Sequence, residues 1–151
     1  ETITRLLEME IDPFNFADAL LGILAQRLVR TLCKDCKEAY APSQEEFAEL
    51  MQEYGLEWWD KLGIKYSPDF KLFRPKGCPK CNNTGYKGRM GIHELLVGSD
   101  DIKRAVQRRA PIDELRTLAM DQGMTTLRQD GLLKMFRGIV DFKQVRAVAV
   151  K

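Results

Sequence analysis

Apolar residues recur every three or four positions at the start of the chain, which is the spacing of a helix with one buried side. Residues 3–10 read as a short amphipathic helix. Asp12 and Pro13 then supply an N-cap and a first helical residue. Because the same spacing continues, it predicts a second helix of about five turns over residues 13–31. Its polar side, which we expect to be solvated, carries Gln26, Arg27 and Arg30.

The middle of the chain predicts one helix and one short strand. Ser43 and Glu46 have the spacing of a capping box, and Gly55 is placed to end a helix that runs to Tyr54. Residues 70–73 alternate loosely and predict the strand.

The last third of the chain predicts a strand followed by four helices. Residues 84–97 are first punctuated by glycine and then strand-like. The first helix begins at Ser99 or Asp100, and the second begins at Pro111 and ends at Gly123. The third begins at Thr126, which has capping-box spacing with Gln129, and ends at Gly138. The fourth begins at Asp141. We expect these helices to form a compact bundle packed on the strand, so the fold class is mostly α with a small β component.

Composition is that of a globular protein with a real core. The 151 residues suffice for one ordinary domain or two small ones, and 44% of them are apolar. No apolar run approaches the ~20 residues that a membrane-spanning helix needs. Lys and Arg exceed Asp and Glu by two, so the net charge gives no argument for nucleic-acid binding. The start at Glu1, directly inside an amphipathic pattern, suggests a piece of a larger protein.

The four cysteines form two Cys-x-x-Cys pairs, Cys33 with Cys36 and Cys78 with Cys81. A two-residue spacer lets both sulfurs of a pair reach one metal ion, and two pairs complete a tetrahedral thiolate shell. Gly and Asn around the second pair permit the tight turn of a zinc knuckle. The pattern therefore predicts one zinc ion, structural rather than catalytic because four protein ligands leave no open position.

Other interpretations of the cysteines are weaker. Two disulfides need an oxidising compartment, and the chain shows no export segment. A redox dithiol would occur once and open a helix. An iron–sulfur cluster uses the same ligands, so spacing alone leaves it open, as it does four unrelated buried thiols. In a small metal-held module, Trp58 and Trp59 are expected to cover the site and build its minor core, although they could form a binding surface.

Catalytic machinery is not recognisable. The glycine-rich run before residue 92 lacks the Gly-x-x-x-x-Gly-Lys-Ser/Thr arrangement of a phosphate-binding loop, and so does the rest of the chain. His93, the single histidine, has no nucleophile or acid partner in the pattern, so we expect a strand residue with a structural hydrogen bond.

Several motifs occur in one order that resembles a known family. Residues 24–32 run directly into the first cysteine pair, and the second pair is followed by Thr84-Gly85-Tyr86-x-Gly88-Arg89-x-Gly91-Ile92-x-Glu94 and then by Gly123-Met124-x-Thr126-Leu127-x-x-Asp130-Gly131. Over essentially its whole length the chain resembles the C-terminal portion of the ATPases that drive type II secretion and type IV pilus assembly. The cysteines mark it as similar to the tetracysteine branch, since the pilus-retraction ATPases lack them. Residues 2–9 resemble the family segment that follows its histidine motif.

The resemblance also implies a fold, an assembly and a partner for the parent protein. It implies a fragment of a RecA-type α/β motor whose ATP and Mg²⁺ sites lie upstream, in a protein that forms a homo-hexamer at the cytoplasmic face of the bacterial inner membrane. It also implies an inner-membrane platform protein as partner, with membrane association only through partners. Only Cys33, Cys36, Cys78 and Cys81 carry over, as zinc ligands; no catalytic or cofactor-binding residue does. His93 and residues 139–140 depart from the family pattern without touching these positions.

The resemblance divides the chain into three expected segments. Residues 1–32 are the helical end of the motor core, residues 33–89 are the zinc module, and residues 90–151 are a strand with the C-terminal helices. The parent is then an ATP hydrolase and this chain alone is not. The alternative is a nucleic-acid-binding zinc ribbon, in which Tyr86 stacks on a base and the nearby cations Lys80, Lys87 and Arg89 bind phosphate.

Overall fold

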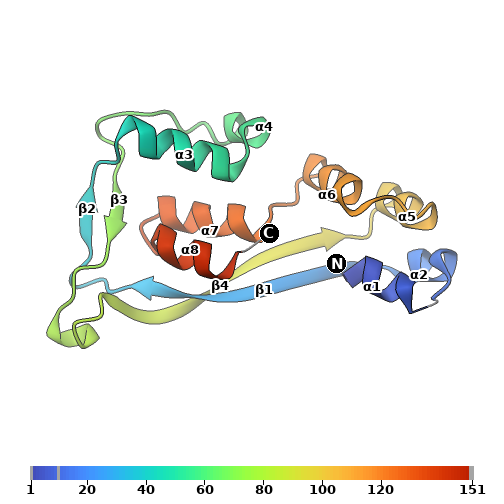
Figure 1. Ribbon diagram of the computed structural model, residues 1–151, viewed down its shortest axis with the longest axis horizontal. Coiled ribbons are helices and arrows are strands. Elements are labelled where there is room, and N and C mark those ends of the chain that lie inside the picture. The colour runs from blue at the N-terminus through green and yellow to red at the C-terminus, as the bar shows by residue number, and fades with distance from the viewer. Residues whose placement is uncertain (1, 10, 150–151) are drawn as a thin grey trace. The chain divides into compact units, whose positions relative to one another are not determined.

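The computed structural model describes residues 2–9 and 11–149, which form two compact units. Unit 1 comprises Glu1–Ala25 and His93–Thr126, and unit 2 comprises Gln26–Ile92 and Leu127–Lys151. Strands β1 (Gly22–Leu32) and β4 (Tyr86–Val97) pair with each other, and each contributes residues to both units (Figure 1). About half of the described chain is helical and the sheet component is small, so the mostly α class expected from the sequence is confirmed only in part.

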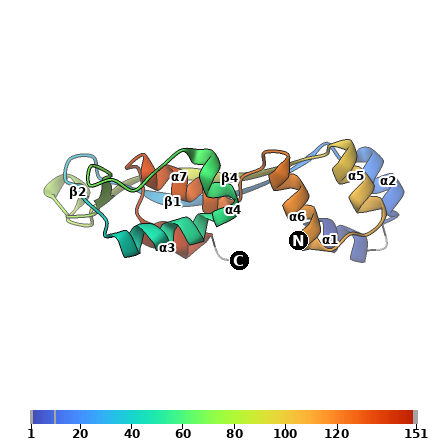
Figure 2. The same ribbon diagram turned by 90° about the horizontal axis from the view of Figure 1, so that it is seen from above.

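Unit 1 is built from four helices and the adjoining strand ends. They are α1 (Thr2–Glu8), α2 (Pro13–Ala19), α5 (Asp100–Gln107) and α6 (Ile112–Asp121). Helix α2 packs on α5, and α5 on α6 (Figure 2). Their buried apolar residues form one core: Ile3, Ala17, Leu20, Ile102, Ala105, Val106, Leu115 and Ala119. The predicted first helix is confirmed to Glu8, and its predicted end at residue 10 lies outside the described residues.

The predicted helix over residues 13–31 is wrong beyond Ala19. Asp12 does cap α2, accepting a hydrogen bond from the backbone N–H of Phe14 at 3.0 Å. Leu20 then turns into an extended conformation, and residues 22–32 form β1. A Cβ on Gly22 would lie 3.1 Å from the carbonyl oxygen of Leu96, so β4 approaches the backbone closely there. Pairing with a distant strand overrides the local helical spacing.

Unit 2 consists of a small sheet, four helices and two 3₁₀ turns. Strands β2 (Glu38–Tyr40) and β3 (Leu72–Arg74) are antiparallel, with Ala39 opposite Phe73. The helices are α3 (Gln44–Tyr54), α4 (Leu56–Trp59), α7 (Leu127–Phe136) and α8 (Phe142–Val148), and the 3₁₀ turns are η1 (Asp60–Leu62) and η2 (Pro79–Cys81). Helix α7 packs against both α3 and α8 (Figures 1 and 2).

An aromatic cluster forms much of the core of unit 2. Trp59 is 3% exposed and meets Phe47, Tyr54 and Phe136 edge to face, with ring centroids 5.5, 5.8 and 5.6 Å away. Trp58 packs on the same core. The tryptophans therefore help build a core, as expected, but the ring contacts of Trp59 join α3, α4 and α7 and involve none of the cysteines.

Most predicted helix boundaries are confirmed, because the caps are local. Ser43 accepts from the N–H of Glu46 at 3.1 Å and begins α3, and Asp141 accepts from Gln144 at 3.3 Å and begins α8. Gly55, with a φ of 104°, ends α3. The single C-terminal bundle is wrong: α5 and α6 belong to unit 1, whereas α7 and α8 belong to unit 2. None of the described helices is long and apolar enough to cross a membrane.

Candidate metal centre

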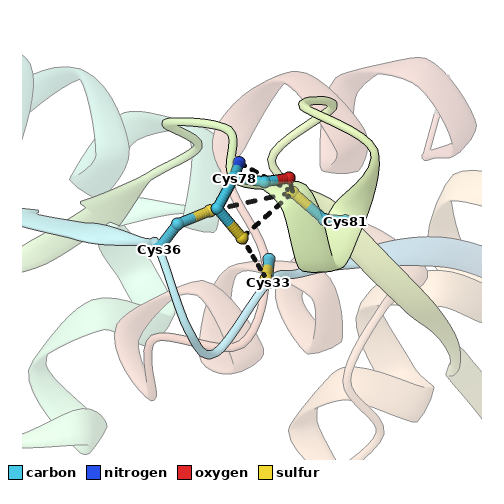
Figure 3. Close-up of side chains that lie close together, drawn as sticks. All are labelled: Cys33, Cys36, Cys78 and Cys81. Carbon is cyan, nitrogen blue, oxygen red and sulfur yellow. Dashed lines mark hydrogen bonds between the residues drawn. The ribbon is translucent and has the colours of Figure 1, made fainter.

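Two turns bring the four cysteines together. The first turn leaves the end of β1, placing Cys33 directly after Leu32 and Cys36 before β2. The second is η2, which Cys78 caps and Cys81 ends. In Figure 3 the side chains from the two turns point toward one another. Asn82 and Asn83, both with positive φ, carry the chain out of η2 in the left-handed region that such a tight turn requires.

The sulfur positions fit four ligands of one metal ion. All four Sγ atoms lie within 4.8 Å of one another. The Sγ–Sγ distances are 3.8 Å for Cys33 and Cys78, 3.9 Å for Cys36 and Cys81, and 3.7 Å for Cys78 and Cys81. Four sulfurs placed tetrahedrally at about 2.3 Å from one ion lie about 3.8 Å apart. The geometry therefore provides a site for a single ion with thiolate ligands.

Backbone N–H groups are directed at sulfurs of both cysteine turns. Cys81 Sγ accepts from the N–H of Cys78 at 3.3 Å and from that of Gly85 at 3.2 Å. Cys36 Sγ accepts from the N–H of Gly77 at 3.3 Å. Gly77 and Gly85 both have positive φ, and a Cβ on Gly85 would lie 2.4 Å from the Cβ of Pro75. Residue 85 must therefore be glycine, and the conformation that glycine allows there lets its N–H donate to the sulfur of Cys81.

These contacts separate the pKa values of two thiols. Burial favours the neutral thiol and raises the pKa of Cys36 to about 11, since the N–H of Gly77 offsets it only in part. Burial also acts to raise the pKa of Cys81, but the N–H groups of Cys78 and Gly85 outweigh it and lower that pKa to about 6. The lowered pKa favours the thiolate form of Cys81 at neutral pH before any metal binds.

The chain segments that carry the cysteines are rich in basic residues, which the net charge of the whole chain conceals. Residues 27–40 and 71–89 carry ten Lys and Arg but only two Asp and Glu. Lys80 and Asp35, one from each cysteine turn, form an exposed ion pair at 3.6 Å. Four thiolates around a divalent ion leave two negative charges, so this basic setting favours the metal-bound form.

The first cysteine turn is tied to the turn between α7 and α8. Lys37 donates from Nζ to the carbonyl oxygen of Gly138 at 2.8 Å, and the same ammonium lies 4.4 Å from the centroid of the Phe73 ring. One residue before Cys33, the N–H of Leu32 donates to the carbonyl oxygen of Ile139 at 2.8 Å. The metal centre and the last two helices therefore share direct hydrogen bonds.

A second connection runs through Tyr86, directly after the knuckle. Its hydroxyl donates to Asp141 Oδ2 at 2.6 Å, and Asp141 is the residue that caps α8. The Arg30 guanidinium lies 5.0 Å from the centroid of the Tyr86 ring, and the Arg30 N–H donates to Gln144 at 3.1 Å. Burial, and then the bond to Asp141, raise the pKa of Tyr86 well above its usual value. Tyr86 is thus engaged on both its ring and its hydroxyl.

The structure decides between several of the sequence-based interpretations. All four cysteines are free, and their sulfurs are too far apart for disulfides, which need about 2.05 Å. Four unrelated thiols are contradicted by the cluster itself. His93 lies exposed in β4 and is not a member of the cluster. That the four cysteines bind zinc stays a prediction.

Sequence reasoning missed the residues that support the site. Lys37 and Tyr86 follow the two cysteine pairs closely, but their partners lie 101 and 55 residues away, so no local pattern reveals them. The capping position of Asp141 was visible, yet its second role as acceptor for Tyr86 was not. Arg30 is exposed, as expected for a solvated face, and in addition covers the Tyr86 ring.

Comparison with known proteins agrees with the motif order. The family model described as "Type II/IV secretion system protein" matches residues 1–147. The chain is 40% identical to the type IV pilus assembly ATPase PilB of Thermus thermophilus over all of this chain and 16% of that protein. It is 41% identical to type II secretion system protein E of Pectobacterium carotovorum and 39% identical to type II secretion system ATPase E of Vibrio cholerae, over 95% and 97% of this chain and 26% of each relative. The chain thus spans between 16% and 26% of the length of these relatives.

Proposed function

Because the chain belongs to the type II/IV secretion system protein family, we propose that it is the structural zinc-binding region of a secretion or pilus-assembly ATPase. The observation that carries the metal assignment is that three Sγ–Sγ distances of 3.7–3.9 Å match the edge of a zinc tetrathiolate, with all four Sγ atoms within 4.8 Å of one another. The proposed ligands are Cys33, Cys36, Cys78 and Cys81. Bound zinc would supply a cross-link between the two turns and no catalytic position, since four protein ligands close the shell.

Zinc suits this site better than an iron–sulfur cluster. A cluster distributes its cysteines over different iron atoms, so their sulfurs lie farther apart than four ligands of one ion. Here all four Sγ atoms lie within 4.8 Å of one another. Among single ions, Zn²⁺ is the usual occupant of a tetrahedral four-cysteine site.

The parent protein is proposed to be an ATPase that powers secretion or pilus assembly. The pilus relative and the Vibrio relative are both named as ATPases. In this proposal the ATP and Mg²⁺ sites lie outside the chain, in a RecA-type motor of which residues 1–32 are the last part. Residues 33–89 form the zinc module, and residues 90–151 form the strand and C-terminal helices. The parent assembles as a homo-hexamer at the cytoplasmic face of the inner membrane and acts on an integral platform protein there.

The role of the zinc module is proposed to be mechanical. Zinc would fix the end of β1, which replaces the helix expected over residues 13–31, to the knuckle that precedes β4. Through Lys37 and Tyr86, the same cross-link holds the turn that begins α8. Unit 2 would then move as one body when the nucleotide site of the parent changes state.

Two experiments test these statements separately. Native mass spectrometry of the chain, purified without a metal-affinity step, should show the mass of one zinc ion, and Cys81→Ser should abolish it. In the full-length parent, chelation of zinc should impair ring assembly or ATP turnover, and added zinc should restore them. Unchanged assembly and turnover after complete metal loss would contradict the mechanical role. The isolated chain should hydrolyse no ATP.

A nucleic-acid-binding ribbon is the second candidate, since the chain segments that carry the cysteines are rich in basic residues. Against it, Tyr86, the aromatic residue expected to stack on a base, is covered by Arg30 and bonded to Asp141. Salt-dependent binding of a single-stranded oligonucleotide, lost in Lys87→Ala or Arg89→Ala, would support this candidate over the first.

A further inference from the structure

We propose that oxidation turns the metal centre into two disulfides, each of which joins the two cysteine turns: Cys33 with Cys78 and Cys36 with Cys81. The proposal rests on the proposed zinc site. It goes beyond that site because it gives the same four residues a second, metal-free state in which the turns stay linked. Two observations carry it: the distances between sulfurs of opposite turns, and the paired strands that flank both turns.

Each proposed disulfide takes one sulfur from each turn. The Sγ atoms of Cys33 and Cys78 lie 3.8 Å apart, and those of Cys36 and Cys81 lie 3.9 Å apart. A disulfide bond is about 2.05 Å long, so each pair has to close by roughly 1.8 Å. The side chains of the two turns point toward one another (Figure 3), so small side-chain rotations bring the paired sulfurs together.

The competing disulfide lies within one turn. Cys78 and Cys81 are 3.7 Å apart, so distance alone does not decide between the two pairings. Direction does, because the side chains of each turn extend toward the opposite turn, and a bond within a turn has to redirect both of them (Figure 3). A within-turn bond would also leave the two turns unlinked once the metal is gone.

Paired strands hold the two turns together independently of any metal. Strands β1 and β4 pair on one side of the turns, and β2 and β3 pair on the other. Between them, the N–H of Cys33 donates to the carbonyl oxygen of Gly85 at 2.9 Å. The partners of each proposed disulfide are 45 residues apart in the chain, but the fold has already closed that loop. Each pair therefore reacts at a high effective concentration.

Burial gives the two members of each pair different parts in the reaction. Cys36 and Cys78 are partly exposed, so either can meet a dissolved oxidant. Their partners Cys81 and Cys33 are buried, which shelters them from the oxidant but leaves them close to the oxidised sulfur. The two pairs are equivalent in this respect, so the proposal needs no order between them.

The oxidant in this proposal is a peroxide. The exposed thiolate sulfur bonds to one peroxide oxygen, the O–O bond breaks and hydroxide leaves, which gives a sulfenic acid. The buried thiolate then bonds to that sulfur, the S–O bond breaks and a second hydroxide leaves. Each disulfide thus delivers two electrons to one peroxide, and two peroxides oxidise all four cysteines. Because thiolates are the metal-binding form of cysteine, the metal is released.

Disulfide mapping on the zinc-loaded chain tests the pairing. The chain is treated with excess hydrogen peroxide, remaining thiols are blocked with iodoacetamide, and zinc release is followed with a chromogenic chelator. Digestion without reduction then separates all four cysteines, because trypsin cuts between the members of each Cys-x-x-Cys pair, after Lys34 and after Lys80. We expect one zinc released per two disulfides. The expected cross-linked peptides are residues 31–34 with 77–80 and residues 35–37 with 81–87.

A stability measurement adds a check that does not need mapping. The oxidised, zinc-free chain should unfold about 1 M higher in urea than the reduced, zinc-free chain, because a bond across 45 residues restricts the unfolded chain. Dithiothreitol should remove the difference. A within-turn bond closes only a short loop, so the absence of a shift would count against the cross-turn pairing.

The outcomes separate this proposal from the proposed function. A chain that binds zinc but forms within-turn disulfides or sulfinic acids overturns the proposal and leaves the zinc site intact. The same holds if zinc stays bound after oxidation. A reduced chain that binds no zinc overturns both.

Discussion

The hydroxyl of Tyr86 links the cysteine knuckle to the last helix, and Tyr86→Phe removes that link alone. The ring, its contact with Arg30 and the cap that Asp141 gives to α8 all remain. The lost bond is short, 2.6 Å from the hydroxyl to Asp141 Oδ2, and its acceptor is a carboxylate. Hydrogen bonds to charged groups contribute about 1.5–3 kcal/mol. Because Tyr86 is only partly buried, we expect a loss near the lower end, about 1.5 kcal/mol.

Tryptophan fluorescence during urea unfolding measures this loss in the right unit, since Trp58 and Trp59 both lie in unit 2. The matched control is Tyr66→Phe, which removes the same atom from a tyrosine of unit 2 that is 39% exposed and whose hydroxyl makes no hydrogen bond within the described residues. The control should leave the free energy of unfolding unchanged. A loss for Tyr86→Phe no larger than that of the control would refute the proposed link. Chelating the metal should shrink the difference between the two variants, because the knuckle then no longer fixes Tyr86.

Three further predictions follow from unit 2 and unit 1. Lys37→Met should lower the free energy of unfolding of unit 2 by about 1–2 kcal/mol, because it loses the hydrogen bond to Gly138 and the contact with the Phe73 ring. The control is Lys34→Met, at an exposed lysine in the same turn, which should leave that free energy unchanged. Equal losses for the two variants would contradict the prediction. Gly138→Ala should cost about 2 kcal/mol more than Gly63→Ala. Both glycines have positive φ, but only at residue 138 would the new Cβ meet a ring, 2.7 Å from Phe73, and equal urea midpoints would refute this. In unit 1, the Arg108 guanidinium holds the pKa of Glu114 below its usual range. A depressed carboxyl pKa stabilises the fold above the unfolded pKa of about 4.3 and loses that effect as pH falls. Glu114→Gln should therefore melt below the unmodified chain at pH 7 and equal to it near pH 3, by circular dichroism, and a gap that persists in acid would be inconsistent with this origin.

The parts of the structure that the sequence predicts are those with local causes. The caps at Ser43 and Asp141 and the stop at Gly55 need only a few neighbouring residues, and each is found where the pattern predicts it. The cysteine cluster was also predictable, because two pairs with metal-ligand spacing have one simple geometric solution.

The failures have non-local causes. Residues 22–32 have leucines at helical spacing, yet partly buried Ile23 and Ala25 and buried Val29 alternate with exposed neighbours, and the partner strand comes from residues 86–97. Neither the strand nor its partner can be inferred from the spacing alone. The same holds for the contacts of Lys37 and Tyr86 with the α7–α8 turn, which join residues that only the folded chain brings together.

The most direct test of the zinc assignment is X-ray absorption at the zinc edge of the purified chain. The account predicts a single shell of four sulfur atoms at about 2.3 Å, with no nitrogen or oxygen ligand and no second metal nearby. A mixed shell that includes nitrogen or oxygen, a metal–metal distance typical of a cluster, or a chain that binds no zinc while its cysteines are reduced would contradict it.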